Sequence, residues 1–267
     1  MAARLGDADH ARHAEEVLRD GQTILRGHFP ETVLRAWHTA FTPLLDAHIQ
    51  REGMLRNRGT ERYYVTLPFT APFADERIFA DADVLAVVER LVGADFTMGQ
   101  LATDTPLIGS EYQEIHRDAP PLFPEWGRET PPFQLAVNFP LVDVTLDNGP
   151  FEVAPATHML AKDEGMARLE RGEVALQPML MSLGDVMIRD VRGLHRGTPN
   201  RTAEPRPMCV IGYSRRWLLR PEVSIRIPRA MYDGLSQRAR AMLRHNPIVD
   251  DLAAVAPDTE VYQAYAY

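Results

Sequence analysis

His116 and Asp118, separated by one residue, form a pair whose side-chain types suit metal binding. On a β-strand, residues i and i+2 point to the same face, so an imidazole and a carboxylate at this spacing can reach one ion. A second histidine would complete the two-histidine, one-carboxylate triad that binds Fe(II) and leaves coordination positions open. The preceding segment, EYQEIH, is expected to be such a strand.

The His-x-Asp pattern carries little weight by itself. Nine histidines and 37 acidic residues in 267 produce about one such pattern by chance. His13-Ala14-Glu15 has the same form. It falls in a polar helix, where residues i and i+2 diverge, so we assign it to a solvated helix face.

Residues further along the chain support a metal site. Gly184-Asp185 predicts a turn, Val186–Ile188 predicts a strand, and His195 follows in the turn-rich segment HRGTPN. Arg206 comes eleven residues after His195. A planar guanidinium meets a carboxylate with two parallel hydrogen bonds, so Arg206 suits the far end of a dicarboxylate. His158 is the rival third histidine.

As an ordered set, these residues resemble the phytanoyl-CoA dioxygenase-like family of Fe(II)/2-oxoglutarate oxygenases. The similar stretch runs from about residue 111 to 213 and contains the segments QEIHRD, NGPFEVAPATH and DVRGLHRGTPN. The resemblance implies a mainly β fold with a double-stranded β-helix core, a jelly roll of the cupin kind. It also implies that Arg206 binds the 5-carboxylate of 2-oxoglutarate and that three residues bind iron: His116, Asp118 and His195.

The resemblance places three more residues near the cosubstrate. Gln113 matches a glutamine that contacts 2-oxoglutarate in some members, although on a regular strand its side chain points away from the first histidine. Asn138 falls where some members place a cosubstrate contact, on the polar side of the alternating segment FQLAVNFPL. Gly197 stands where some members offer a hydroxyl to the cosubstrate, so either Thr198 substitutes or no residue does. Gln113 and Asn138 have an equally ordinary reading as polar residues on a solvated sheet face.

A departure from the family pattern occurs at Pro155-Ala156-Thr157-His158, where the family usually has Pro-Gly-Ser-His. Loss of the glycine predicts a slightly different turn.

Asp118 bears on the reaction outcome, because related halogenases lack this carboxylate so that chloride can bind. We therefore expect O2 and 2-oxoglutarate to be converted to succinate and CO2 while a substrate is hydroxylated; desaturation, epimerisation and cyclisation use the same triad and stay open.

The loop from 119 to 132 contains five prolines together with Phe123, Trp126 and Arg128. A stiff loop next to the metal ligands is expected to be a lid or a pocket wall, the alternative being a rigid surface connection. Tyr64 could line the mouth of the pocket. On resemblance alone, the expected substrate is a small natural-product intermediate or an amino-acid derivative.

Helices are expected at residues 8–20, 31–50 and 80–92, where apolar side chains recur at helical spacing, and a strand at 62–67. From about residue 95, short runs rich in Val, Ile, Phe and Thr alternate with turn residues. We expect one domain over 1–267, with helices from about 8 to 92 supporting a jelly roll at about 95–220. A helix over Pro228–Leu243 and the tail VYQAYAY would complete residues 221–267.

Composition narrows the class of protein. A net charge of −8 and a pI near 5.6 argue against nucleic-acid binding, and no apolar run approaches the roughly 20 residues that cross a bilayer. A single cysteine, Cys209, and no signal-peptide pattern fit a reducing, cytoplasmic setting. We expect a monomer or homodimer that acts on a small molecule. The alternatives are a cupin-like metal-binding protein or isomerase without 2-oxoglutarate, an inactive interaction protein and a zinc hydrolase.

Overall fold

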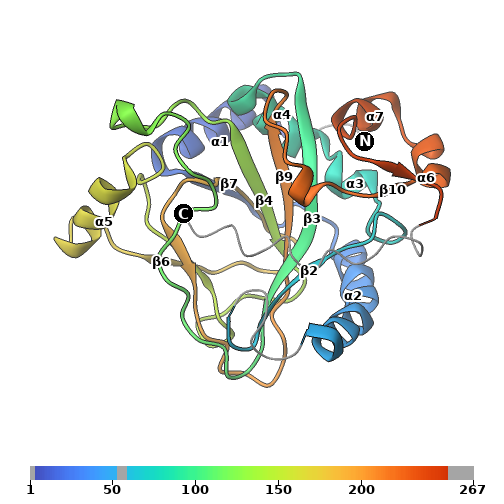
Figure 1. The fold of residues 1–267 in the computed structure, drawn as a ribbon, viewed down its shortest axis with the longest axis horizontal. Coiled ribbons are helices and arrows are strands. Elements are labelled where there is room, and N and C mark those ends of the chain that lie inside the picture. The colour runs from blue at the N-terminus through green and yellow to red at the C-terminus, as the bar shows by residue number, and fades with distance from the viewer. Residues whose placement is uncertain (1–3, 53–58, 252–267) are drawn as a thin grey trace.

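A six-stranded antiparallel sheet forms the larger half of the β core. The structure is a computed structural model that describes residues 4–52 and 59–251. The large sheet has the order β1 (Gln22–Leu25), β7 (Val186–Asp190), β4 (Gln134–Pro140), β9 (Met208–Arg215), β3 (Phe96–Pro106) and β2 (Arg62–Thr66). Strands distant in sequence are therefore neighbours, which brings their side chains to one surface (Figure 1).

A second, three-stranded antiparallel sheet completes the core. Its order is β6 (Gln177–Met179), β5 (Phe151–Val153) and β8 (His195–Gly197). Side chains from both sheets line one cavity, so the cavity lies between them. The expectation of a mainly β, jelly-roll fold with flanking helices is confirmed.

Helices cover the outer face of the large sheet. They are α1 (Asp7–Asp20), α2 (Glu31–Glu52), α3 (Glu76–Phe79) and α4 (Ala82–Val92) (Figure 1). Helices α1, α2 and α4 lie close to the ranges expected from helical spacing, whereas α3 was not expected. Trp37 of α2 packs edge-on against Phe139 of β4, with ring centroids 5.5 Å apart. Both belong to one large apolar cluster that joins these helices to the sheet. Burial of this helix–sheet interface is the main hydrophobic contribution to the fold.

Alternation along β4 separates the two faces of the large sheet. Leu135, Val137 and Phe139 join the helix-side apolar cluster. Gln134, Ala136 and Asn138 face the interior cavity instead. Because successive side chains on a strand point to opposite faces, one strand serves both the core and the cavity. The polar lining expected from the sequence is thus present.

Two expected elements differ in the structure. EYQEIH is not a strand: of these residues only His116 forms a β-bridge. The helix expected over Pro228–Leu243 is divided into α6 (Arg229–Gly234) and α7 (Gln237–Met242). The break has a local cause, because Leu235 is extended and Ser236 caps α7 by accepting a hydrogen bond from the backbone of Ala239 at 3.2 Å.

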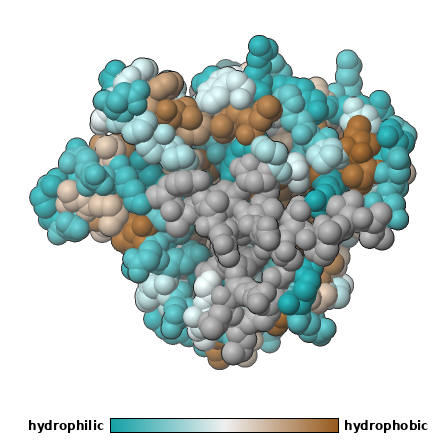
Figure 2. Space-filling model, in the orientation of Figure 1, coloured by the Kyte–Doolittle hydropathy of each residue, from teal (hydrophilic) through white to brown (hydrophobic). Residues whose placement is uncertain are grey.

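Shorter elements connect and flank this core. They are the 3₁₀ helices η1 (Pro124–Trp126) and η2 (Pro221–Val223), helix α5 (Lys162–Glu170), and the parallel pair β10 (Ile227–Pro228) and β11 (Ile248–Val249). The tail VYQAYAY lies outside the described residues. Within the described ranges, no helix combines the length and the apolar character that a membrane span requires. On the face in Figure 2 the described surface is mostly hydrophilic, with apolar clusters between.

The assignment of His13 to a solvated helix face was wrong. The side chain is buried, and its Nδ1 lies 2.7 Å from the Thr23 hydroxyl of β1. Burial lowers the pKa of His13, with Arg12 adding to the effect. The histidine therefore ties α1 to the edge of the large sheet.

Ala156 occupies the position of the family glycine and keeps the backbone that a glycine would favour. Its φ is +60°, a left-handed value that costs about 1–2 kcal/mol for a residue with a Cβ. We expect Ala156→Gly to raise the free energy of unfolding by roughly 0.5–1 kcal/mol, after the greater chain entropy of glycine is subtracted. Urea unfolding measures this. Ala86→Gly, inside α4, should instead lower stability by about 1 kcal/mol; destabilisation by both variants would contradict the assignment.

Candidate metal centre and cosubstrate pocket

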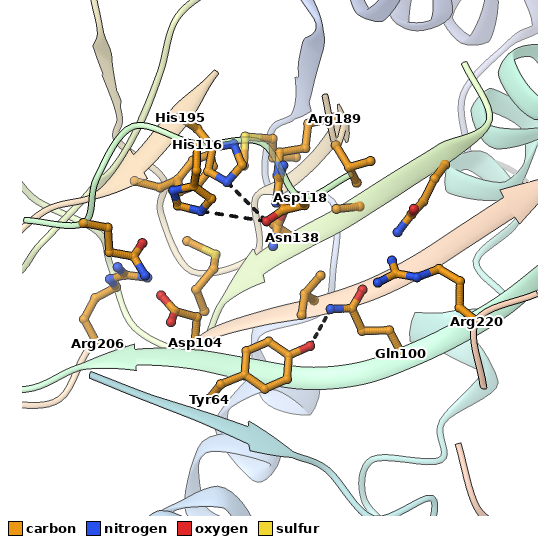
Figure 3. A pocket seen from close by; sticks show the side chains of 18 residues that line it. Tyr64, Gln100, Asp104, His116, Asp118, Asn138, Arg189, His195, Arg206 and Arg220 are labelled. Atoms are coloured by element: carbon orange, nitrogen blue, oxygen red, sulfur yellow. Dashed lines mark hydrogen bonds and ion pairs between the residues drawn. The ribbon is translucent and has the colours of Figure 1, made fainter. Parts of the chain in front are cut away.

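Three ligand-type side chains converge in the cavity between the sheets. Nitrogen and oxygen atoms of His116, Asp118 and His195 all lie within 4.8 Å of one another. Asp118 Oδ1 is 3.9 Å from His116 Nε2 and 3.5 Å from His195 Nε2 (Figure 3). The donor set, two imidazole nitrogens and one carboxylate oxygen, matches the facial triad of non-haem iron sites.

Backbone carbonyls hold both imidazoles in the orientation that ligation needs. His116 Nδ1 is 2.7 Å from the Glu114 carbonyl, and His195 Nδ1 is 2.8 Å from the Gly193 carbonyl. Each ring thus donates its Nδ1 proton to the backbone and presents Nε2 as the acceptor nitrogen. A fixed tautomer and ring direction are the usual outer support of a histidine metal ligand.

Backbone pairing sets the distance between the two histidines. The amide of His116 donates to the carbonyl of His195 at 3.0 Å, and the reverse bond is 3.1 Å. They are therefore a directly opposed antiparallel pair, whose side chains lie close together; the ring centroids are 4.4 Å apart. His195 lies on strand β8, not in the turn that its sequence context predicted.

Arg189 of β7 binds one of the two Asp118 carboxylate oxygens and leaves the other for the metal site. Its Nη2 donates to Asp118 Oδ2 at 2.5 Å, so Oδ1 faces the histidines. Burial alone would raise the pKa of Asp118, but electrostatic interactions with His195 and Arg189 outweigh it and hold the pKa well below its usual range. The carboxylate is therefore charged and directed toward the site of the ion.

The cavity is lined by five strands of the large sheet (β2, β3, β4, β7 and β9), by β5 and β8 of the small sheet, and by the segment that carries His116 and Asp118 (Figure 3). Apart from the three ligand-type side chains, its lining consists of Tyr64, Gln100, Asp104, Gln113, Gln134, Ala136, Asn138, Phe151, Met187, Arg189, Val191, Arg206, Met208, Val210 and Arg220. Polar groups thus converge in a mostly pre-formed pocket, as in enzyme active sites.

Arg206 lies at one end of this cavity with a charge that the protein does not neutralise. It is 1% exposed, and among the described residues no carboxylate forms an ion pair with it. Nη2 donates to the Gly149 carbonyl at 2.5 Å, while the buried Nε has no partner. Burial, and then the nearby Arg62, lower its pKa to about 9. An anion held against Arg206 would relieve both penalties.

Arg62 fills the space at Gly197. A Cβ on Gly197 would lie 2.5 Å from the Arg62 guanidinium, so this glycine is required by packing. Arg62 donates to Asp104 at 2.8 Å and to the Thr198 carbonyl at 2.7 Å. The Thr198 hydroxyl donates to Pro150 and does not line the cavity. A second guanidinium therefore lies where the family comparison led us to look for a hydroxyl.

Gln113 and Asn138 both line the cavity. Gln113 is not on a strand, so the parity objection does not apply; its Oε1 accepts from the Gly197 amide at 2.9 Å. Asn138 accepts from Arg189 Nε at 3.1 Å and donates to the Cys209 carbonyl at 3.2 Å. It thereby orients the arginine that binds Asp118.

The proline-rich loop places its large side chains at the surface. Phe123 and Trp126 are 42% and 57% exposed and stack on each other, and neither they nor Arg128 line the cavity. Tyr64 does. The 3₁₀ turn η1 directs this part of the loop outward, so closeness in sequence to the ligands does not become closeness in space.

His158 lies apart from the ligand cluster. It is buried against Gly21, where an added Cβ would be 2.9 Å from its Nδ1, and its Nε2 is 3.2 Å from the Leu18 carbonyl. Burial lowers the pKa of His158. A neutral, packed imidazole against α1 accounts for this residue.

A buried ion network fixes the segment between the first two ligands. Arg117 donates to Glu129 at 2.8 Å and to the carbonyls of Thr157 and Leu160. Arg192, just after β7, lies 3.3 Å from the second Glu129 oxygen. Burial lowers the pKa of Arg117, and Arg192 adds to this, while Glu129 opposes both. The network joins the ligand segment, the proline-rich loop and β7 below the metal centre.

Sequence reasoning did not identify Arg189, Asp104 or Arg62 as parts of the site. Arg189 carried a usable signal, since it is an arginine inside the otherwise apolar strand VMIRD, which is buried at every position. A charged residue in such a strand requires a partner in the interior. Which partner depends on sheet pairing, which no local pattern reveals.

A jelly roll that gathers two imidazoles and a carboxylate in its interior has the architecture of a mononuclear metal enzyme. The sequence model of the phytanoyl-CoA dioxygenase family matches residues 17–208. The chain belongs to the phytanoyl-CoA dioxygenase family, which confirms the resemblance found in the sequence. Members of this family are enzymes of the iron- and 2-oxoglutarate-dependent type, and family membership places the chain in that class.

Solved structures share the fold. The 2-oxoglutarate-dependent epimerase SnoN of nogalamycin biosynthesis is 20% identical with a TM-score of 0.60, covering 79% of this chain and 84% of its own. EctD from S. alaskensis, with bound Fe, is 20% identical with a TM-score of 0.59 and 80% coverage of both chains. HygX from Streptomyces hygroscopicus, with nickel and 2-oxoglutarate, is 17% identical with a TM-score of 0.58, covering 81% and 90%.

Glu129→Gln tests the buried network. The isosteric change removes the negative charge that neutralises the buried Arg117 and should lower the free energy of unfolding by roughly 3–5 kcal/mol, measured by urea unfolding. The matched control is Glu164→Gln, whose partner Arg168 is 40% exposed; a surface pair contributes less than about 1 kcal/mol. A Glu129→Gln loss as small as the control's would show that the network does not support the site.

Proposed function

We propose that this protein is a non-haem Fe(II)- and 2-oxoglutarate-dependent dioxygenase that oxidises a small molecule. His116, Asp118 and His195 would hold the iron, and Arg206 would bind the distal carboxylate of 2-oxoglutarate. The observation that carries the proposal is one cavity that contains both a facial triad and a buried guanidinium with which no carboxylate of the described residues forms an ion pair. A cupin-like metal site without 2-oxoglutarate needs no such guanidinium.

The residues present fit both groups. Three protein ligands would leave coordination positions of Fe(II) open for the cosubstrate, and the iron would supply the oxidative chemistry. Arg206 and Gln113 lie in the same lining and could orient the cosubstrate. EctD with Fe and HygX with nickel and 2-oxoglutarate are structures of the same fold, which supports this choice of cofactors.

The retained carboxylate Asp118 favours hydroxylation over halogenation. Its interactions with Arg189 and both histidines favour the charged carboxylate, which would occupy the coordination position that chloride would need. The fold neighbours include an epimerase and a carbocyclase from nogalamycin biosynthesis, which supports a small-molecule substrate of the natural-product or amino-acid kind. Tyr64 lines the cavity and is our proposed substrate contact. Phe123, Trp126 and Arg128 do not line it, and their contact with substrate stays a prediction.

An anaerobic titration with Fe(II) and then 2-oxoglutarate tests the central claim. A weak visible charge-transfer band should develop only when both are present, and succinate should form when O2 is admitted. Arg206→Gln should keep iron binding and raise the apparent dissociation constant of 2-oxoglutarate about 10- to 100-fold, the value of one charge-assisted contact. Arg216 is an exposed arginine in the loop after β9, and Arg216→Gln is the control that should bind 2-oxoglutarate as wild type does. Absence of the band in wild type would refute the proposal.

Two histidine variants settle the third ligand. His195→Ala should weaken Fe(II) binding by more than about 100-fold, beyond the 10- to 100-fold typical of an outer partner. His158→Ala should leave the affinity unchanged while lowering stability, because its ring packs against α1. Calorimetry with Mn(II) as a redox-stable substitute measures both; the opposite ranking would make His158 the ligand.

A further inference from the structure

The cavity has two ends, which the strand register separates. Along β9, Val210 pairs with Asn138, Gly212 with Ala136 and Ser214 with Gln134 of β4. Ala136 also pairs with Arg189, whose guanidinium holds Asp118. The metal ligands therefore lie level with the middle of β4. Arg206, just before β9, lies toward the Asn138 end, and Gln134 lies on the opposite side.

A distinct set of side chains gathers at this opposite end. Figure 3 shows Arg220 across the cavity from Arg206, with Gln100 and Tyr64 along the wall between them. Gln134 joins them in the cavity lining. The apolar side chains of Ala136, Val191 and Val210 contribute to the same lining. We call Arg220, Gln100 and Gln134 the distal polar cluster.

Gln100 reaches the cavity through a strained backbone. Its φ is +71°, at a β-bulge between Gly99 and Leu101 of β3. The facing residue must be small, because a Cβ on Gly212 would lie 2.6 Å from the Gly99 carbonyl. The Gln100 amide donates to the Tyr64 hydroxyl. A non-glycine residue in this conformation costs of order 1–3 kcal/mol and marks functional positions more often than structural ones.

Gln134 has a side-chain amide that faces the cavity. The residue is only 4% exposed, and no hydrogen bond to its side chain is found within residues 4–52 and 59–251. Its amide atoms are not among the fully buried atoms without a partner, so they are open to the cavity. A molecule bound in the cavity could therefore accept and donate there.

We propose that the distal polar cluster binds the carboxylate of the primary substrate, which is therefore a small carboxylic acid with an apolar body. Arg220 would meet the carboxylate, while Gln100 and Gln134 donate or accept beside it, and Ala136 and Val210 pack against the body. A guanidinium and two amides supply several donors to the two oxygens of a carboxylate, whereas a phosphate dianion would call for more cations. This inference rests on the proposed function, which assigns the other end of the cavity to 2-oxoglutarate.

The experiment uses the full-length protein with Fe(II) and 2-oxoglutarate under anaerobic conditions. The probes are N-acetyl amino acids, each paired with its carboxamide, and inorganic phosphate. A shift of the charge-transfer band, as opposed to its loss, reports binding beside the cosubstrate. At least one acid should shift the band at a concentration about tenfold or more below its amide. Arg220→Gln should weaken that acid about 10- to 100-fold and leave the amide unchanged.

Gln134→Leu should also weaken the acid and should leave the 2-oxoglutarate dependence of the band unaltered. Arg216→Gln, whose side chain is 70% exposed, is the matched control and should behave as wild type. A band that forms normally but responds to no acid, to acid and amide equally, or to phosphate as well as to acid would overturn this inference alone. No band in wild type would instead refute the proposed function.

Discussion

Buried positive charge is the constraint around which this jelly roll is organised. Four arginines are among its largest fully buried side chains: Arg62, Arg117, Arg192 and Arg206. A guanidinium taken out of water must be compensated, or it destabilises the fold by several kcal/mol. The first three meet Asp104, Glu129 and Asp190 within the described structure. Arg206 forms no ion pair with a carboxylate there, so the guanidinium at this end of the cavity keeps an uncompensated charge.

These ion pairs also explain why the metal ligands are placed so firmly without a long strand to hold them. Arg117 lies between His116 and Asp118 and points away from the cavity into the Glu129 network. On the cavity side, Asp118 is bound by Arg189, which Asn138 orients in turn. Opposite sides of one short segment are thus anchored by separate charges. This arrangement pre-organises the ligands with little regular secondary structure.

Local patterns predicted what depends on local order. Helical spacing located α1, α2 and α4, and alternation in FQLAVNFPL placed Asn138 on the cavity side. The ordered motifs located the three ligand-type residues, which the structure brings together. Arg189 and Arg62 escaped because their roles arise from cross-strand pairing and from the vacancy left by Gly197. Trp126 is close to Asp118 in sequence but does not line the cavity, because sequence distance does not determine the direction of a turn.

The positions of Arg206 and Gln134 in the cavity are as informative as their side-chain types. Arg206 and Gln134 are both buried in one cavity, and the register places them on opposite sides of the ligand level. A fold that needed only to bind a metal would gain nothing from either, since a buried cation without a carboxylate partner lowers stability and an amide that faces a cavity adds none. Two such groups flanking one triad are what a reaction between two bound molecules requires. The uncompensated charge matches a dicarboxylate cosubstrate, and the amide that faces the cavity, with Arg220 beside it, matches a second and smaller acid.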